Sequence, residues 1–323
     1  MVSHLHIDRG RPHVKKLALT ASMLLALTAC SSSPDAPTPP ANVVGMTIDQ
    51  PDGTQVVVPR NPRSVVSFDF GTVDTLVALG LGDRVKGTAS GVPTYLKNSL
   101  PARVDTGSMK EPDERAIRKL DPDVIMVTGR QGEQGQALSK IAPTLDMSLE
   151  GQGYLQGLER NVLALGTLFG RLPEARQQLQ VTAAKIGQAH MRVANSGKRT
   201  LVLTHNDGNF SPTEQPVIYS VLQAPRALAA PPPAQPGAPR QRPQPMDVNQ
   251  VLAADPEVIF IIDRSAAIGA EPLTTEALRA SPLSATSAGR NGQIVYLDPA
   301  LWYLSGGGLL SLSLQLDEAA AAY

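Results

Sequence analysis

Two stretches of the chain share one layout: DPDVIMVTGR at residues 121–130 and DPEVIFIIDR at residues 255–264. Each begins with Asp-Pro, continues with a run of apolar residues and ends in an arginine at the same distance from the proline. An apolar run of this length next to a turn signal is typical of a strand buried on both faces, as in parallel sheets covered by helices. The repeat therefore predicts two similar units, each with an arginine at the carboxyl end of a strand.

Strand and helix patterns alternate on both sides of the repeat. An N-terminal hairpin is predicted at residues 47–58, with its turn at Pro51-Asp52-Gly53. The predicted strands are 65–68, 124–128, 201–204, 258–262 and 294–297, and the predicted helices between them are 73–79 and 115–120. This alternation favours an α/β fold with mostly parallel sheets.

The middle of the chain interrupts the alternation. Residues 154–169 and 173–193 both have apolar positions at helical spacing, and no strand pattern separates them. We therefore expect two Rossmann-like lobes joined by a long connector helix, which suits a folded part of about 280 residues. The predicted limits are 46–152 for the N-terminal lobe, 153–196 for the connector helices and 197–323 for the C-terminal lobe.

The first 45 residues are predicted to be a targeting segment. Two lysines precede an apolar run at residues 17–29, which is typical of an export signal and too short for a permanent membrane helix. The signal ends in Leu-Thr-Ala-Cys, which resembles the lipobox of bacterial lipoproteins and predicts lipidation of Cys30, the only cysteine. The alternative is an unlipidated signal followed by a chance cysteine. Residues 30–45 then form a flexible tether, rich in Ser and Pro.

Charge and histidine content exclude some partners. Without residues 1–29 the net charge falls from zero to near −3, so nucleic acid is an unsuitable partner. Only His190 and His205 remain, too few for a histidine-based metal cluster. A metal would have to arrive already chelated or find oxygen ligands.

A proline-rich segment at residues 225–245 contains eight prolines and cannot form a helix or a central strand. Its composition suits a disordered surface insertion. Its arginines, Arg226, Arg240 and Arg242, leave open a loop at the edge of a cleft.

Arg130 and Arg264 are the first candidate site residues. Ligands of α/β sheets bind outside the carboxyl ends of the strands, and both arginines occupy that end. Guanidinium groups stay charged and stack on aromatic rings, so the pair suits a large anion with many oxygens and π surface. The alternative is that each pairs with an acid, as Arg264 would with Asp263. A second candidate is Trp302-Tyr303, before three glycines; such a pair is more often core than site.

In combination these stretches resemble the periplasmic iron-chelate (siderophore) binding proteins of bacterial ABC importers, in particular the ferric catecholate branch. The resemblance covers residues 61–308. The matching stretches are SVVSFDFGTVDTLVALGLGDRVKG (64–87), LDPDVIMVTGRQ (120–131), IAPTLDMSLE (141–150), NVLALGTLFG (161–170), DPEVIFIIDR and YLDPALWYLSGGGL (296–309). Members hold the chelate in a shallow cleft between two α/β lobes joined by a long helix and deliver it to a membrane permease.

The resemblance implies site residues position by position. Arg130 and Arg264 match arginine ligand contacts, Trp302 would lie beside the cleft, and Tyr303 matches a tyrosine that completes iron coordination in some members. Gln215 stands where a third cleft arginine is expected, which Arg226, Arg240 or Arg242 would have to replace. No histidine is present where some members place the partner of the tyrosine.

Docking on the permease is also changed. The family's two docking glutamates align with Arg115 and Asn249, so the nearby acids Asp113, Glu114 and Asp247 become the candidates.

The sequence thus predicts a lipid-anchored, monomeric binding protein of the cell envelope for an anionic ferric siderophore. It needs no cofactor besides that ligand. The alternatives are a receptor for another chelate, such as haem, cobalamin or a different siderophore, and an interaction lipoprotein without a transport role. An enzyme is disfavoured, because the chain has no Gly-x-Ser-x-Gly elbow, phosphate-binding glycine loop or His-Glu-x-x-His motif.

Overall fold

The computed structural model of the protein describes residues 45–149, 153–232 and 244–323. The predicted signal, Cys30 and all but the last residue of the tether lie outside these residues, as does 233–243 of the proline-rich segment, and these features stay predictions. No helix within the described residues is both long enough and apolar enough to cross a membrane.

The first sheet has five strands, all parallel, in the order β5-β4-β3-β6-β7. The strands are β3 (Val65–Ser67), β4 (Val85–Thr88), β5 (Val104–Asp105), β6 (Val124–Val127) and β7 (Thr144–Asp146), and the helical segments between them are α1 (Phe70–Ala78), η1 (Gly82–Arg84), α2 (Thr94–Lys97), α3 (Glu114–Leu120) and α4 (Glu133–Leu138). The antiparallel hairpin of β1 (Gly45–Asp49) and β2 (Gln55–Pro59) precedes it, as predicted. We call this part the N-terminal lobe.

The second sheet has four strands in the order β11-β10-β8-β9, and only β9 is antiparallel. Its strands are β8 (Thr200–Asn206), β9 (Asn209–Pro212), β10 (Val258–Asp263) and β11 (Ile294–Leu297). The helical segments of this C-terminal lobe are η2 (Val217–Val221), α7 (Val248–Ala254), α8 (Arg264–Ala267), α9 (Thr275–Ala280), η3 (Pro282–Ala285), α10 (Ser287–Arg290) and η4 (Ala300–Leu304).

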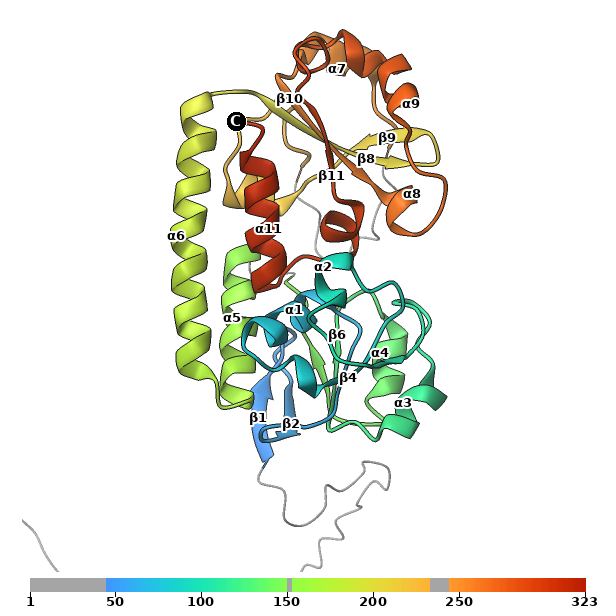
Figure 1. Ribbon diagram of the computed structural model, residues 1–323, viewed down its shortest axis with the longest axis vertical. Helices are drawn as coiled ribbons and strands as arrows, with labels where there is room; N and C mark the ends of the chain where they lie inside the picture. The colour runs from blue at the N-terminus through green and yellow to red at the C-terminus, as the bar shows by residue number, and fades with distance from the viewer. Residues whose placement is uncertain (1–44, 150–152, 233–243) are drawn as a thin grey trace, which may run out of the picture. The chain divides into compact units, whose positions relative to one another are not determined.

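Three longer helices complete the fold: α5 (Tyr154–Leu168), α6 (Leu172–Ser196) and α11 (Leu309–Ala320). The 25-residue α6 packs against α5 and α11, and α11 also packs against α1 of the N-terminal lobe (Figure 1). The predicted α/β class, with mostly parallel sheets and a long connecting helix, is confirmed. The residue limits predicted for the two lobes stay a prediction.

The Asp-Pro repeat has the same backbone in both lobes. Asp113 and Asp247 cap the N-termini of α3 and α7, and each helix ends at an aspartate in the left-handed conformation, with φ of 44° at Asp121 and 41° at Asp255. The strands that follow, β6 and β10, are buried along their whole length. Each buried Val, Ile or Leu contributes about 1.5–3 kcal/mol to folding, so these strands anchor their sheets.

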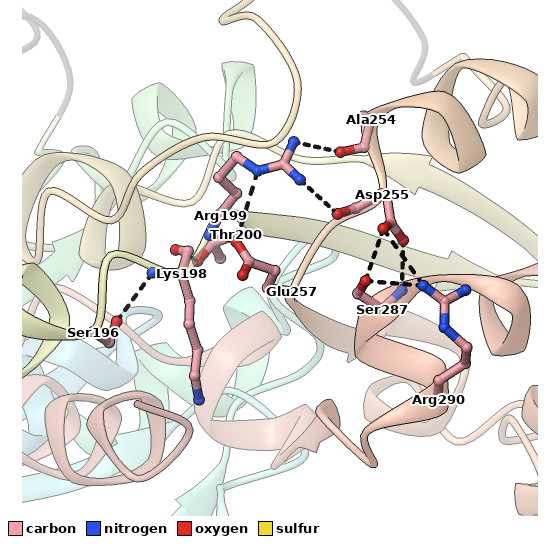
Figure 2. Close-up of polar contacts among 9 residues, drawn as sticks. All are labelled: Ser196, Lys198, Arg199, Thr200, Ala254, Asp255, Glu257, Ser287 and Arg290. Atoms are coloured by element: carbon pink, nitrogen blue, oxygen red, sulfur yellow. Dashed lines mark hydrogen bonds and ion pairs between the residues drawn. The ribbon is translucent and has the colours of Figure 1, made fainter.

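Polar contacts fasten the start of the second copy (Figure 2). The Arg199 guanidinium donates to the carbonyls of Ala254 and Asp255, at 2.5 and 2.9 Å. The Asp255 carboxylate accepts from the backbone N–H and hydroxyl of Ser287, at 2.6 and 2.7 Å. This network holds the amino end of β10, opposite the end that carries Arg264.

Two segments form π-helical turns rather than α-helix. Hydrogen bonds five residues apart close both of them, from Leu222 N–H to the Val217 carbonyl in η2 and from Ser305 N–H to the Ala300 carbonyl in η4. Pro216 and Pro299 directly precede the two turns. Such turns are rare and gather at functional sites.

Candidate functional site

Arg130 and Arg264 contact the same residue, Tyr303. Arg130 follows β6 and is exposed; its Nη2 donates to the Tyr303 carbonyl at 2.9 Å, and its Nη1 lies 3.3 Å from the Met109 sulfur. Arg264 opens α8 and is half-buried; its Nε donates to the Tyr303 hydroxyl at 2.8 Å. Its Nη1 also donates to Asn206 Oδ1. The strand ends of both lobes are thus joined at one tyrosine.

The Tyr303 ring is close to both guanidinium groups. The central carbons of Arg130 and Arg264 lie 6.0 and 5.7 Å from the ring centroid, within cation–π range. Within the described residues neither arginine forms an ion pair with an acid. Both positive charges therefore remain available to an anionic ligand.

Asp263 does not pair with Arg264, contrary to the structural alternative weighed from the sequence. Its carboxylate is fully buried and accepts from His205 Nδ1, the Tyr296 hydroxyl and the Leu273 N–H, at 2.8, 2.8 and 2.7 Å. Burial by itself raises the pKa of Asp263, but the hydrogen bonds from His205, Leu273 and Tyr296 outweigh it and lower the pKa below its usual value. This network stiffens the strand end that carries Arg264.

A pocket of about 360 Å³ opens at the carboxyl ends of β3 and β6. Residues of both lobes line it, and they are mostly apolar or uncharged. They are Phe68, Asp69, Met109, Thr128, Gly129, Arg130, Met147, Ser148, Leu149, Tyr154, Gln215, Pro216, Val217, Trp302, Leu304, Ser305, Gly306, Gly307 and Gln315. We call this the cleft pocket.

The remaining predicted ligand residues also lie here. Trp302 is 4% exposed, lines the cleft pocket and donates from Nε1 to Glu318 at 2.6 Å, so it is both core and pocket wall. Gln215 lines the pocket, and its Oε1 accepts from the N–H of Val217, the first residue of η2, at 3.2 Å. Arg264 instead lines a second cavity of about 850 Å³ in the C-terminal lobe, with His205, Asp207 and Glu271.

Arg226 does not supply the missing third charge. Its guanidinium makes two hydrogen bonds to the Glu214 carboxylate, at 2.6 and 2.5 Å, and lies 3.8 Å from the centroid of the Tyr219 ring. The ion pair with Glu214 raises the pKa of Arg226. Arg240 and Arg242 lie outside the described residues.

Two acceptors of the cleft pocket were missed by the sequence reasoning. Asp69 follows β3 and caps α1, and its Oδ2 accepts from the Thr72 N–H and hydroxyl at 2.8 and 2.7 Å. Burial raises the pKa of Asp69, and this effect outweighs the hydrogen bonds from Thr72 and the positive charge of Arg130, which lower the pKa. Gln315, on α11, is 2% exposed. The strand-end rule that selected the arginines also points to Asp69; no sequence signal marks Gln315.

The three proposed docking acids have local partners. Asp113 Oδ1 accepts from the Arg115 and Ala116 N–H groups at 2.9 and 3.0 Å, and Asp247 Oδ1 makes the equivalent bonds to Asn249 and Gln250. Glu114 forms an exposed pair with Arg118 at 3.2 Å. Their role in docking stays a prediction.

Across residues 45–149, 153–232 and 244–323, no group of three or more His, Cys, Asp or Glu side chains is arranged to hold a metal ion. Tyr303 therefore stays a proposed ligand that would add to the donors of a bound chelate.

Comparison with known proteins defines the class. The chain belongs to the periplasmic binding protein family, whose model matches residues 65–301. The petrobactin-binding protein YclQ of Bacillus subtilis is 33% identical over 271 aligned positions, covering 83% of this chain and 85% of YclQ. Its crystal structure superposes with a TM-score of 0.78 over 86% of this chain and 98% of that one.

One further relative in sequence and one further solved structure are similar to this chain. The ferric-anguibactin-binding protein FatB of Vibrio anguillarum is 26% identical over 325 aligned positions, 95% of this chain and 97% of FatB. The siderophore-binding protein BauB has a TM-score of 0.76 over 86% of this chain and 98% of that chain, and its 24% identity makes it a likeness of fold. The resemblance predicted from the sequence is confirmed.

Proposed function

We propose that the protein is the substrate-binding lipoprotein of an ABC importer, and that it captures an anionic ferric siderophore of catecholate type between its lobes. The convergence of Arg130 and Arg264, one from each sheet, on Tyr303 carries this proposal. Relatives named for binding petrobactin and ferric anguibactin support it.

The physical case rests on charge and π contact. Removing an anionic chelate from water is costly, and two guanidinium groups that form no ion pair with a described acid offset that cost. Tyr303 and Trp302 add aromatic surface for catecholate rings, and Met109 and Met147 add polarizable surface. Binding by this site relies on charge and ring contact more than on a deep apolar pocket.

The remaining parts of the proposal concern location and partners. A lipid on Cys30 would hold the protein, as a monomer, at a membrane of the cell envelope. Asp113, Glu114 and Asp247 would face the permease, with one docking face on α3 and one on α7. The protein would carry no cofactor besides its ferric ligand and would perform no catalysis.

The first test is a fluorescence titration of the mature protein with Cys30 replaced by Ser. Trp302 is the only tryptophan and lines the cleft pocket, so it reports on occupancy. The panel is a ferric catecholate, a ferric hydroxamate, ferric citrate, haem and cobalamin. We expect saturable quenching by the catecholate at submicromolar concentration, which corresponds to about −8 kcal/mol or better.

The double variant Arg130→Ala/Arg264→Ala is expected to lose this response. Arg171→Ala is the matched control, because Arg171 pairs with Glu174 on the surface of α6, away from the pocket. Quenching by haem or another chelate alone would replace the proposed ligand. Unchanged catecholate affinity in the double variant would refute the role of the arginines.

Transport is tested separately from binding. Cells that lack the protein should lose uptake of the bound ferric chelate, and the wild-type protein should restore it when the permease is intact. If uptake is normal without the protein, the interaction role weighed from the sequence is favoured over transport.

A further inference from the structure

The side chains of Asp69 and Gln315 give the cleft pocket two oxygen acceptors that a ligand can use. Asp69 is half-buried and uses Oδ2 to cap α1, and its carboxylate has capacity to accept a further hydrogen bond at Oδ1. Gln315 donates from Nε2 to the Leu301 carbonyl at 3.1 Å, which fixes the orientation of its amide. Its Oε1 is buried without a partner. A buried acceptor left unpaired costs free energy, so Gln315 Oε1 favours a ligand that brings an N–H or O–H donor. The Asp69 carboxylate, on the wall of the same pocket, favours a donor that is also positively charged.

The charges near the two arginines do not suit a chelate of high negative charge. In the cleft pocket Arg130 faces Asp69, and in the neighbouring cavity Arg264 shares the wall with Asp207 and Glu271. Gln215 is neutral, and Arg226 is paired with Glu214. Three acids thus line the same two cavities as the two arginines, and they lower the positive charge available to a ferric tris-catecholate with a charge near −3.

Resting on the proposed function, we propose that Asp69 and Gln315 select a ferric catecholate chelate that carries a protonated amine. The catecholate oxygens face Arg130 and Arg264, and the ammonium group donates to Asp69 Oδ1 and Gln315 Oε1. The ammonium charge also keeps the Asp69 carboxylate ionised, because an opposite charge nearby favours the charged form. The bound chelate then has a net charge smaller in magnitude than −3.

The test uses two synthetic ferric chelates with the same three catecholates, one on a neutral linker and one on a linker with a single protonated amine. We expect the wild-type protein to bind the amine chelate at least tenfold more tightly, as a hydrogen bond between charged groups allows. Asp69→Asn keeps the helix cap, since Asn caps as well as Asp, and should reduce this preference about tenfold. Gln315→Met keeps the side-chain size and should reduce it severalfold.

Asp123→Asn is the matched control. Asp123 also accepts two backbone N–H bonds, from Arg63 and Ser64. It lies at the amino end of β6, whereas the cleft pocket lies at the carboxyl ends of the strands. It should leave the preference unchanged.

The possible outcomes separate the two proposals. If wild-type protein binds both chelates equally, or if Asp69→Asn and Gln315→Met both keep the full preference, the selection by amine is wrong and the receptor function stands. If neither chelate binds, while haem or another chelate of the panel does, the proposed function itself fails.

Discussion

The two arginine-bearing strand ends are built from the same repeat but are supported differently. Arg264 follows the buried Asp263, which is held by His205 and Tyr296, and the arginine itself is half-buried. Arg130 follows Gly129, whose N–H donates to the Ser148 hydroxyl at 2.8 Å, and it is exposed. The C-terminal lobe thus fixes its cation in advance, whereas the N-terminal lobe presents its cation on a more open turn.

Each lobe also buries one acid. Asp263 and Asp74 are the carboxylates with no solvent exposure among the described residues. Asp74, on α1, accepts from Ser311 N–H, Leu310 N–H and the Tyr95 hydroxyl, so it holds the start of α11 against the N-terminal lobe. Burial raises the pKa of Asp74 to about 7, whereas hydrogen bonds lower the pKa of Asp263.

The two strand ends should differ most in how much their supporting residues contribute to the free energy of unfolding. Asp263→Ala leaves His205 and the Tyr296 hydroxyl without their buried partner, which should cost about 3–5 kcal/mol of unfolding free energy. Ser148→Ala, the equivalent change beneath Arg130, should cost about 1 kcal/mol. Urea unfolding of both variants measures the difference, and equal losses would remove the distinction between the two supports.

The buried acids should give opposite pH dependences. The stability linked to Asp74 is present in full below about pH 4 and is lost as the pH rises through about 7, because the folded state favours its protonated form. The shift corresponds to up to about 4 kcal/mol. The stability linked to Asp263 is present above about pH 4 and is lost as the pH falls further.

Unfolding curves at pH 5 and pH 8 test the Asp74 effect. From pH 8 to pH 5 the free energy of unfolding of the wild-type protein should increase, and it should increase by less in Asp74→Asn, which has no carboxyl group to titrate at this position. A pH difference that is identical in the two proteins would show that Asp74 does not titrate in this range.

Loss of the half-buried Arg264 should lower ligand affinity more than loss of the exposed Arg130. We expect Arg264→Ala to weaken chelate binding about 100-fold and Arg130→Ala about tenfold, since charged contacts weaken as exposure to water increases. Titrations of both variants with the same ferric catecholate give the ratio. A larger loss at Arg130 would reverse the ranking.

The smallest effect is expected from Tyr303→Phe. It removes the acceptor of Arg264 Nε but keeps the backbone carbonyl that accepts from Arg130. We expect a severalfold loss of affinity that is additive with Arg130→Ala and not additive with Arg264→Ala. Two double variants complete the cycle, and additivity with both arginines would argue against a specific link to Arg264.

Patterns in the sequence predicted the long elements and the repeat, because buried strands and amphipathic helices leave periodic signals. They missed β4 (VKGT), β5 (VD), β7 (TLD) and β9 (NFSP), in which polar residues, glycine or proline interrupt the apolar run. The predicted β6 is equally short, but all four of its residues are apolar. The expectation that ligands bind at the carboxyl ends of parallel strands predicted Arg130 and Arg264 as site residues. The same expectation fits Asp69, which follows β3 but was not among the predicted residues.

The pairing of side chains could not be predicted from one chain alone. The contacts of Arg226 with Glu214, of Asp263 with His205 and of Tyr303 with both arginines depend on three-dimensional packing. No local sequence pattern indicated the two π-helical turns. A segment of five residues is too short for the spacing of its apolar residues to distinguish a π-helical turn from an α-helical one.

The π-helical turn η4 makes the direction of the Tyr303 ring depend on residue count. Its five-residue hydrogen bond, from Ser305 to Ala300, accommodates one residue more than an α-helical turn. Deleting a single residue between Pro299 and Ser305 would restore α-helical spacing and rotate the remaining side chains by about 100°. A homologue can therefore keep both arginines and the tyrosine and still lose their meeting point, so alignment gaps at this turn are as informative as substitutions.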